Sequence, residues 1–281
     1  MRRRKIEAAL FKGLMWLSTA LIAGSLLAIC WTVVSRGARS LTWDMITQIP
    51  GGGFYIGKGG GILNAILGSV YITFGSVFLG LLIATPVVLY INAYSQRNAW
   101  LANVLRLVFD VLFGIPSIVY GAFGFTIMVF FGLKTSLLAG IITVTLMIVP
   151  ILARAMDEVV RRSPAELPDA AYSLGATRWE TSLLLLRQST AGILTAVLLA
   201  FGRAVGDAAT VLFTAGYTDS IPTSFQQPAA TLPLAIFFQL SSPIDEVQNR
   251  AYAAALILTV IVLAVSLAGK YFGKKLSKYK T

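Results

Sequence analysis

Six stretches of this chain are each apolar over about 20 residues, which is the length an α-helix needs to cross the hydrocarbon core of a bilayer. They cover approximately residues 13–34, 63–91, 101–131, 136–153, 189–216 and 251–272. What remains of the 281 residues contains no stretch long enough for a separate soluble domain. We therefore expect an all-α integral membrane protein with about six transmembrane helices, organised as a single transmembrane domain over residues 1–281.

The composition agrees with this fold class and excludes several functions. Hydrophobic residues make up 57% of the chain and charged residues 12%, whereas a soluble domain carries about 25% charged residues. The chain has no histidine, which excludes Ser-His triads and histidine-bound metals, and its single cysteine, Cys30, lies in an apolar run where it serves as a small hydrophobe. We expect no catalytic residue, no metal and no cofactor.

Two of the apolar stretches need comment. Basic residues 2–5 followed by an apolar run resemble a signal peptide, but the run at 13–34 is too long for one, so we expect a retained transmembrane helix. The stretch 101–131 is long for a single span, and Gly114 and Pro116 predict a kink within it.

The distribution of basic residues predicts the orientation. If both termini are cytoplasmic, 17 of the 23 Lys and Arg residues lie inside, 5 lie outside, and Arg203 is left within a span. Lys and Arg accumulate in cytoplasmic loops, so this asymmetry places both termini in the cytoplasm. The net charge of +11 therefore reflects topology, and we expect no nucleic-acid partner.

Gly52, Gly57 and Lys58 match part of a phosphate-binding loop, but Gly59 stands where a magnesium-binding Ser or Thr is required. No strand precedes the motif, and the predicted topology places it outside. We interpret it as a glycine-rich external loop and expect no nucleotide site in this chain.

The predicted cytoplasmic segment 154–188 contains a short helix between two stops. Capping boxes begin at Ser163 and Thr177, a helix is expected over 168–174, and Gly175 is suited to a left-handed cap. A helix of about seven residues is unstable alone and must pack on something. Its small apolar face consists of Ala170, Ala171 and Leu174. That face can pack on the chain's own membrane end or dock in a groove of a partner, and the residues alone favour neither.

Charged residues within the predicted spans are the candidate functional residues. Arg203 and Asp207 are four residues apart in the fifth span, so we expect them to share one helix face. They form either a structural ion pair or part of an anion path, because a guanidinium matches phosphate oxygens. Gly202 and Gly206 have the spacing that lets another helix approach closely. Asp110, near the cytoplasmic end of the third span, is expected to be either an interfacial acid or a partner for Arg106, four residues earlier, rather than a residue that binds substrate.

The motif Asp169-Ala170-Ala171-x-x-x-Gly175 resembles the EAA loop of ABC importer permeases, with Asp in place of the usual Glu. The resemblance implies that this loop is a coupling helix that sits in an ATPase subunit. It assigns ATPase coupling to Asp169, Ala170, Ala171, Leu174 and Gly175.

Three further segments, residues 60–66, 110–121 and 200–215, resemble the permease family of phosphate ABC transporters, and within it the PstA-like subunits. The family's membrane motif R-x-x-G-E-T-A stands here as Arg203-Ala-Val-Gly206-Asp207-Ala-Ala. The resemblance covers about residues 60–272 and implies a type I importer permease fold. It also implies a bacterial or archaeal plasma membrane, phosphate as solute, two ATPase copies, a PstC-like second permease and an extracytoplasmic phosphate-binding protein.

Three alternatives remain. The chain can be a permease for another oxyanion or small solute, since the binding protein selects most of the substrate. A secondary transporter would show several membrane carboxylates or an inverted repeat, neither of which is clear here. An intramembrane hydrolase would need a nucleophile and base, and none is convincing.

Overall fold

A computed structural model describes residues 2–51, 59–94, 99–164 and 166–278. The described residues are helical apart from their connections, and the one β-type pairing among them is an isolated bridge between Pro50 and Gly60. Residues Gly52, Gly57 and Lys58, which resemble a phosphate-binding loop, lie outside the described residues.

The helices follow one another along the chain as α1 (Arg2–Ser40), α2 (Trp43–Thr47), α3 (Leu63–Leu89), the π-helical turn η2 (Tyr90–Tyr94), α4 (Ala99–Gly114), α5 (Ser117–Phe130), α6 (Leu137–Arg161), α7 (Glu166–Ser173), α8 (Arg178–Val205), α9 (Leu232–Leu240) and α10 (Asp245–Lys278). Within the described part of the chain, five helices are long and apolar enough to cross a membrane: α1, α3 with η2, α6, α8 and α10. A sixth crossing requires the bent pair α4 and α5.

The predicted interruption of the stretch 101–131 at Gly114 and Pro116 is confirmed, but it is a break and not a kink, because α4 and α5 meet at an angle of 95°. Pro116 has no N–H, so the helical hydrogen bond to the Leu112 carbonyl cannot form there. That carbonyl instead accepts hydrogen bonds from the Ile115 N–H at 3.1 Å and the Tyr120 hydroxyl at 2.8 Å. The carbonyl that loses its helical donor at Pro116 is therefore satisfied within the break.

The expected fifth span, 189–216, is wrong at its C-terminal end. Helix α8 begins at Arg178, where Thr177 and Glu180 form the predicted capping box. It ends at Val205, and the chain from Gly206 to Gly216 runs through turns. Asp207 therefore lies beyond the helix that contains Arg203.

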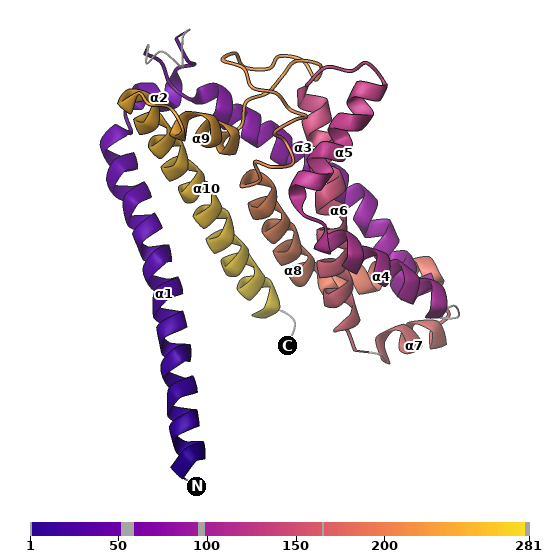
Figure 1. Ribbon diagram of the computed structural model, residues 1–281. Coiled ribbons are helices and arrows are strands. Elements are labelled where there is room, and N and C mark those ends of the chain that lie inside the picture. The colour runs from indigo at the N-terminus through magenta and orange to yellow at the C-terminus, as the bar shows by residue number, and fades with distance from the viewer. Residues whose placement is uncertain (1, 52–58, 95–98, 165, 279–281) are drawn as a thin grey trace.

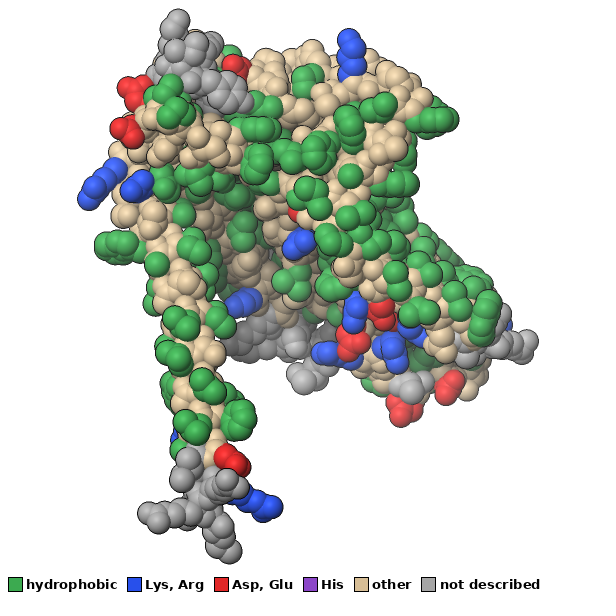
Figure 2. All heavy atoms as spheres, in the orientation of Figure 1, with side chains coloured by type: hydrophobic (Ala, Val, Ile, Leu, Met, Phe, Trp, Pro, Cys, Tyr) green, Lys and Arg blue, Asp and Glu red, His purple; other side chains and the backbone are tan. Residues whose placement is uncertain are grey.

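Helices α3 and α6 form the centre of the molecule. Val144, Ile148 and Leu152 of α6 are fully buried. In the most apolar part of α6, 61% of the residues are buried, whereas in that of α1 none is. Helix α1 packs on α10 near the upper end in Figure 1, where Gly37 lies against Tyr252 and Leu256. Apolar side chains cover much of the visible face of α1 (Figure 2), as suits a helix that faces lipid.

The elements separate into two ends of the molecule. In Figure 1 the start of α1, the end of α10 and helix α7 lie toward the lower side, whereas α2, α9 and the loop before α9 lie toward the upper side. Acidic and basic side chains gather at the lower right of Figure 2, in the region of α4 and α7.

Candidate translocation site and coupling surface

The end of α8 lies next to the break between α4 and α5. Asp207 turns the chain after α8, since its Oδ2 accepts the N–H of Thr210 at 2.8 Å. The hydroxyl of Thr210 reaches the carbonyl of Ser117, the first residue of α5, at 3.3 Å. Two interruptions of helical structure thus meet in one place. Non-helical backbone at membrane depth is tolerated where it is buried in protein or lines a water-filled cavity.

Close approach of these two segments depends on Gly121 in α5. A Cβ at this position would lie 2.7 Å from the carbonyl oxygen of Ala209 and 2.9 Å from that of Thr210. Real Cβ atoms do not approach backbone oxygens so closely, so the contact requires a glycine.

Arg203 lies in the last turn of α8 with its side chain exposed. Among the described residues it takes part in no ion pair, and Asp207 binds Thr210 instead. The expected shared helix face of Arg203 and Asp207 is therefore wrong, because Gly206 ends the helix between them. The guanidinium is left available to an anion at the carboxyl end of a helix, where the helix dipole favours a positive charge.

The glycines beside Arg203 border open space in this chain. A Cβ at Gly202 would meet no atom of another described element within 4 Å, and one at Gly206 would meet only the carbonyl of Gly202. No helix within the described ranges therefore packs closely here, and the expected helix contact at these glycines stays a prediction for a partner chain.

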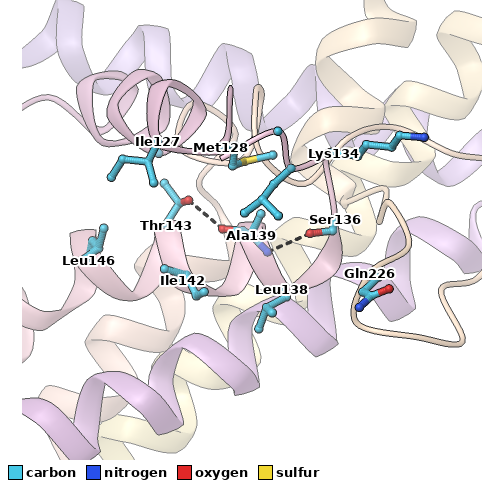
Figure 3. Close-up of a pocket in the computed structure, with 13 residues that line it drawn as sticks. Ile127, Met128, Lys134, Ser136, Leu138, Ala139, Ile142, Thr143, Leu146 and Gln226 are labelled. Atoms are coloured by element: carbon cyan, nitrogen blue, oxygen red, sulfur yellow. Dashed lines mark hydrogen bonds between the residues drawn. The ribbon is translucent and has the colours of Figure 1, made fainter. Parts of the chain in front are cut away.

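A pocket of about 490 Å³ lies between α5 and α6 (Figure 3). Its wall is largely apolar, with Ile127, Met128 and Leu146 among the side chains drawn, and Lys134 and Gln226 lie toward one end. The hydroxyl of Thr143 donates to the Ala139 carbonyl at 2.7 Å, so this group is already engaged. The pocket lacks the set of convergent donors that an anion site needs.

Asp157 of α6 is a charged centre that the sequence reasoning missed. Its side chain is buried and accepts hydrogen bonds from Arg106 of α4, at 2.8 and 3.2 Å, and from Asn92 of η2 at 2.7 Å. The predicted pair of Asp110 with Arg106 is wrong, since Asp110 binds Arg154 at 2.6 Å. Sequence spacing favoured a partner on the same helix, whereas the fold brings α6 beside α4. Residues 154, 157, 158 and 161 share one face of α6 and all carry charge, a pattern that could have indicated the site.

Helix α7 exposes a small surface at the lower end of Figure 1. It begins at Glu166 and not at the expected residue 168, and Pro168 lies in its first turn, where a proline is tolerated. The hydroxyl of Ser163 lies 3.3 Å from that of Ser189. Ala171 is buried against the chain, whereas Leu174 is 90% exposed. The expected apolar face therefore divides, with Ala171 packed inward and Ala170 and Leu174 turned outward.

The C-terminal cap of α7 has the predicted left-handed glycine. Gly175 has φ +81°, a left-handed conformation that favours glycine. The N–H of Ala176 donates to the carbonyl of Ala171 at 3.0 Å, which closes the cap. Asp169 lies on the exposed side of the helix, so it, Ala170 and Leu174 form one surface that no described element covers.

Comparison with known proteins adds family membership to this geometry. The model of the family described as binding-protein-dependent transport system inner membrane component matches residues 76–278. The chain is 34% identical to the phosphate transport system permease protein PstA of Yersinia pestis, over 95% of this chain and 88% of that protein. It is 32% identical to PstA of Haemophilus influenzae, over 96% of this chain and 94% of that protein.

The fold has a solved relative. A chain of the MetNI methionine ABC transporter, in an inward-facing conformation, matches with a TM-score of 0.62 at 21% identity, covering 76% of this chain and 95% of that chain. The arrangement of helices described above is therefore that of an ABC importer permease.

Proposed function

The chain belongs to the family of binding-protein-dependent transport system inner membrane components, and we propose that it is the PstA-like permease subunit of an ATP-driven phosphate importer. The ABC importer permease fold, the multi-pass membrane architecture and the near full-length similarity to PstA proteins support this assignment. In this role the chain supplies half of the translocation pathway as a single domain over residues 1–281, with its core at 60–272.

The observation that carries the proposal is the guanidinium of Arg203, which has no ion-pair partner among the described residues and lies in the last turn of α8, before the turn that contacts α5. A charged side chain within a span is costly unless a partner or a water-filled cavity receives it. Phosphate provides such a partner, because its oxygens match the donor fork of a guanidinium. Arg203 then binds the anion transiently as it crosses.

Asp207 acts on the same site by charge and by position. Its carboxylate lies close along the chain to Arg203 and limits the affinity of the site for an anion, which allows release. Its hydrogen bond to Thr210 holds the turn that follows α8. Gly202 and Gly206 leave room for the second, PstC-like permease to approach the same end of α8.

Helix α7 couples this chain to ATP hydrolysis by a partner. The exposed surface of Asp169, Ala170 and Leu174 docks in an ATPase subunit, while Ala171 and Gly175 fix the helix on the membrane domain. Two ATPase copies and an extracytoplasmic phosphate-binding protein complete the importer. In this role the chain is a transporter subunit, and we expect it to bind and hydrolyse no ATP itself. Both termini and α7 face the cytoplasm of a bacterial or archaeal cell.

Reconstitution tests the assignment. The chain is co-expressed with its second permease and ATPase, the complex is placed in proteoliposomes, and uptake of radiolabelled phosphate is measured with the binding protein and ATP. We expect that unlabelled phosphate inhibits this uptake and that sulfate or molybdate at equal concentration does not. Uptake of another oxyanion in preference to phosphate would change the solute assigned to the importer and leave its role as an importer unchanged.

A further inference from the structure

A groove of about 390 Å³ lies between the end of α3, the turn η2 and the start of α8. Its lining residues are Thr85, Pro86, Leu89, Tyr90, Tyr94, Trp179, Ser182, Leu183 and Leu186. The volume falls within the range of small-molecule sites in proteins. Neither the coupling surface nor the end of α8 shares these residues.

The wall of the groove is suited to hydrocarbon. Trp179, Ser182, Leu183 and Leu186 follow the spacing of one helix face, and the polar member of this set, Ser182, donates its hydroxyl to the Trp179 carbonyl at 2.7 Å. Pro86 and Leu89 of α3 form part of the opposite wall. A group bound between these walls meets a largely apolar surface.

The mouth of the groove is aromatic and basic. Tyr90 and Tyr94 stack with ring centroids 6.2 Å apart, and Trp179 is 64% exposed. The guanidinium of Arg178 lies 6.0 Å above the Tyr94 ring, and its Nη1 donates to the Tyr94 carbonyl at 3.3 Å. Aromatic belts mark the level of lipid headgroups, and Arg178 has further N–H donors that no described residue engages.

The depth of the groove matches part of one leaflet. Trp179 and Leu186 are seven residues apart on α8, which corresponds to about 10 Å along the helix, against about 30 Å for the hydrocarbon core. The mouth lies at the end of α8 that directly follows α7. The occupant therefore enters from the leaflet on the side of α7 and ends inside it, as a lipid acyl chain does.

We propose that this groove is a binding site for an anionic phospholipid of the leaflet that adjoins α7. An acyl chain lies between α3 and α8, and the phosphate lies against Arg178 at the level of Tyr94 and Trp179. The apolar wall selects a lipid over a free anion, and the cation at the mouth selects an anionic headgroup over a zwitterionic one. This site is independent of the solute that the permease carries.

The test is native mass spectrometry of the purified, delipidated complex titrated with phosphatidylglycerol or phosphatidylcholine. Leu183→Trp fills the groove, and Leu184→Trp is its matched control, because Leu184 is equally exposed and does not line the groove. Arg178→Gln removes the charge at the mouth, and Arg178→Lys keeps it. The same spectra report whether all subunits remain assembled, so a failure of assembly is separated from a failure of lipid binding.

We expect tightly retained phosphatidylglycerol that Leu183→Trp removes and Leu184→Trp does not. Loss of one cation near a headgroup is expected to weaken phosphatidylglycerol binding about fivefold in Arg178→Gln, with recovery in Arg178→Lys. Equal retention of both lipids, or unchanged phosphatidylglycerol binding in Leu183→Trp, would overturn the proposal. A cross-link from position 183 to another protein chain in place of lipid would overturn it as well.

Discussion

The guanidinium of Arg106 and the carboxylate of Asp157 form a two-point ion pair that joins α4 to α6, with Nε–Oδ2 at 2.8 Å and Nη2–Oδ1 at 3.2 Å. Asn92 of η2 donates to the same carboxylate at 2.7 Å. Helix α6 ends four residues later, and α7 follows. The segment that leads into the coupling surface is thereby fixed to two neighbouring elements.

This relationship predicts a large effect of a small change. Asp157→Asn leaves Arg106 without its counter-ion in a partly buried place, so we expect a loss of about 2–3 kcal/mol in the free energy of unfolding. The measurement is reversible unfolding of the purified chain in mixed detergent. Glu158→Gln is the control, because its pair with Arg162 is exposed and should contribute less than about 1 kcal/mol. Equal effects of the two changes would contradict the role given to Asp157.

The coupling surface predicts a separation between insertion and ATPase binding. Leu174→Arg places a charge on a 90% exposed side chain, so the chain should still insert, but the ATPase should be lost when the complex is purified. Phe225→Arg, at an exposed position of the loop before α9, is the control and should retain the ATPase. Full ATPase retention in Leu174→Arg would show that this surface does not dock the ATPase.

The turn after α7 gives a second test of coupling. Gly175 has φ +81° and no neighbour within 4 Å of an added Cβ, so Gly175→Val is opposed by backbone strain and not by crowding. Gly132 has φ +64°, equally open surroundings and a place between α5 and α6, so Gly132→Val is a matched control for strain. We expect comparable losses of stability, but loss of ATP-driven uptake in Gly175→Val alone. Normal uptake in both variants would remove Gly175 from the coupling mechanism.

The sequence predicted local features better than the points where helices break. The capping box of Thr177 and Glu180 and the left-handed Gly175 are set by residues a few positions apart, and both are confirmed. The end of α8 was missed because the residues from Gly206 to Gly216 are as apolar as a helix that continues, and hydropathy does not distinguish a turn from a span there. The bond between Thr210 and Ser117 that supports this turn joins distant parts of the chain.

The candidate site was predicted in part from the sequence. Arg203 stood out as a cation within an apolar stretch, and the structure leaves it unpaired among the described residues. Its presumed partner Asp207 was assigned by helix spacing, which fails once the helix ends. Asp157 was overlooked because its partners, Arg106 and Asn92, lie about 50 or more residues earlier, and pairing over that separation depends on the fold.

Orientation is a separate prediction. In a Cys30→Ala background, Ser220→Cys in the loop before α9 should react with an impermeant maleimide added outside intact cells, and Ser173→Cys on α7 should react only after rupture. The exposed Cys30 must be removed so that it does not contribute to labelling. The opposite pattern would invert the topology and place α7 away from any cytoplasmic ATPase.

The central claim is that the guanidinium at the end of α8, which is unpaired in the described part of the chain, takes part in phosphate passage, and Arg203→Gln tests it most directly. Arg39→Gln is the matched control, since Arg39 is also exposed in the last turn of an apolar helix. ATP-driven phosphate uptake is measured in proteoliposomes together with subunit assembly and basal ATPase activity. The account predicts that Arg203→Gln lowers uptake at least about tenfold with assembly and basal ATPase activity intact, that Arg203→Lys recovers little, and that Arg39→Gln is unchanged. Normal phosphate uptake by an assembled Arg203→Gln complex would contradict it, because the pathway would then be lined elsewhere.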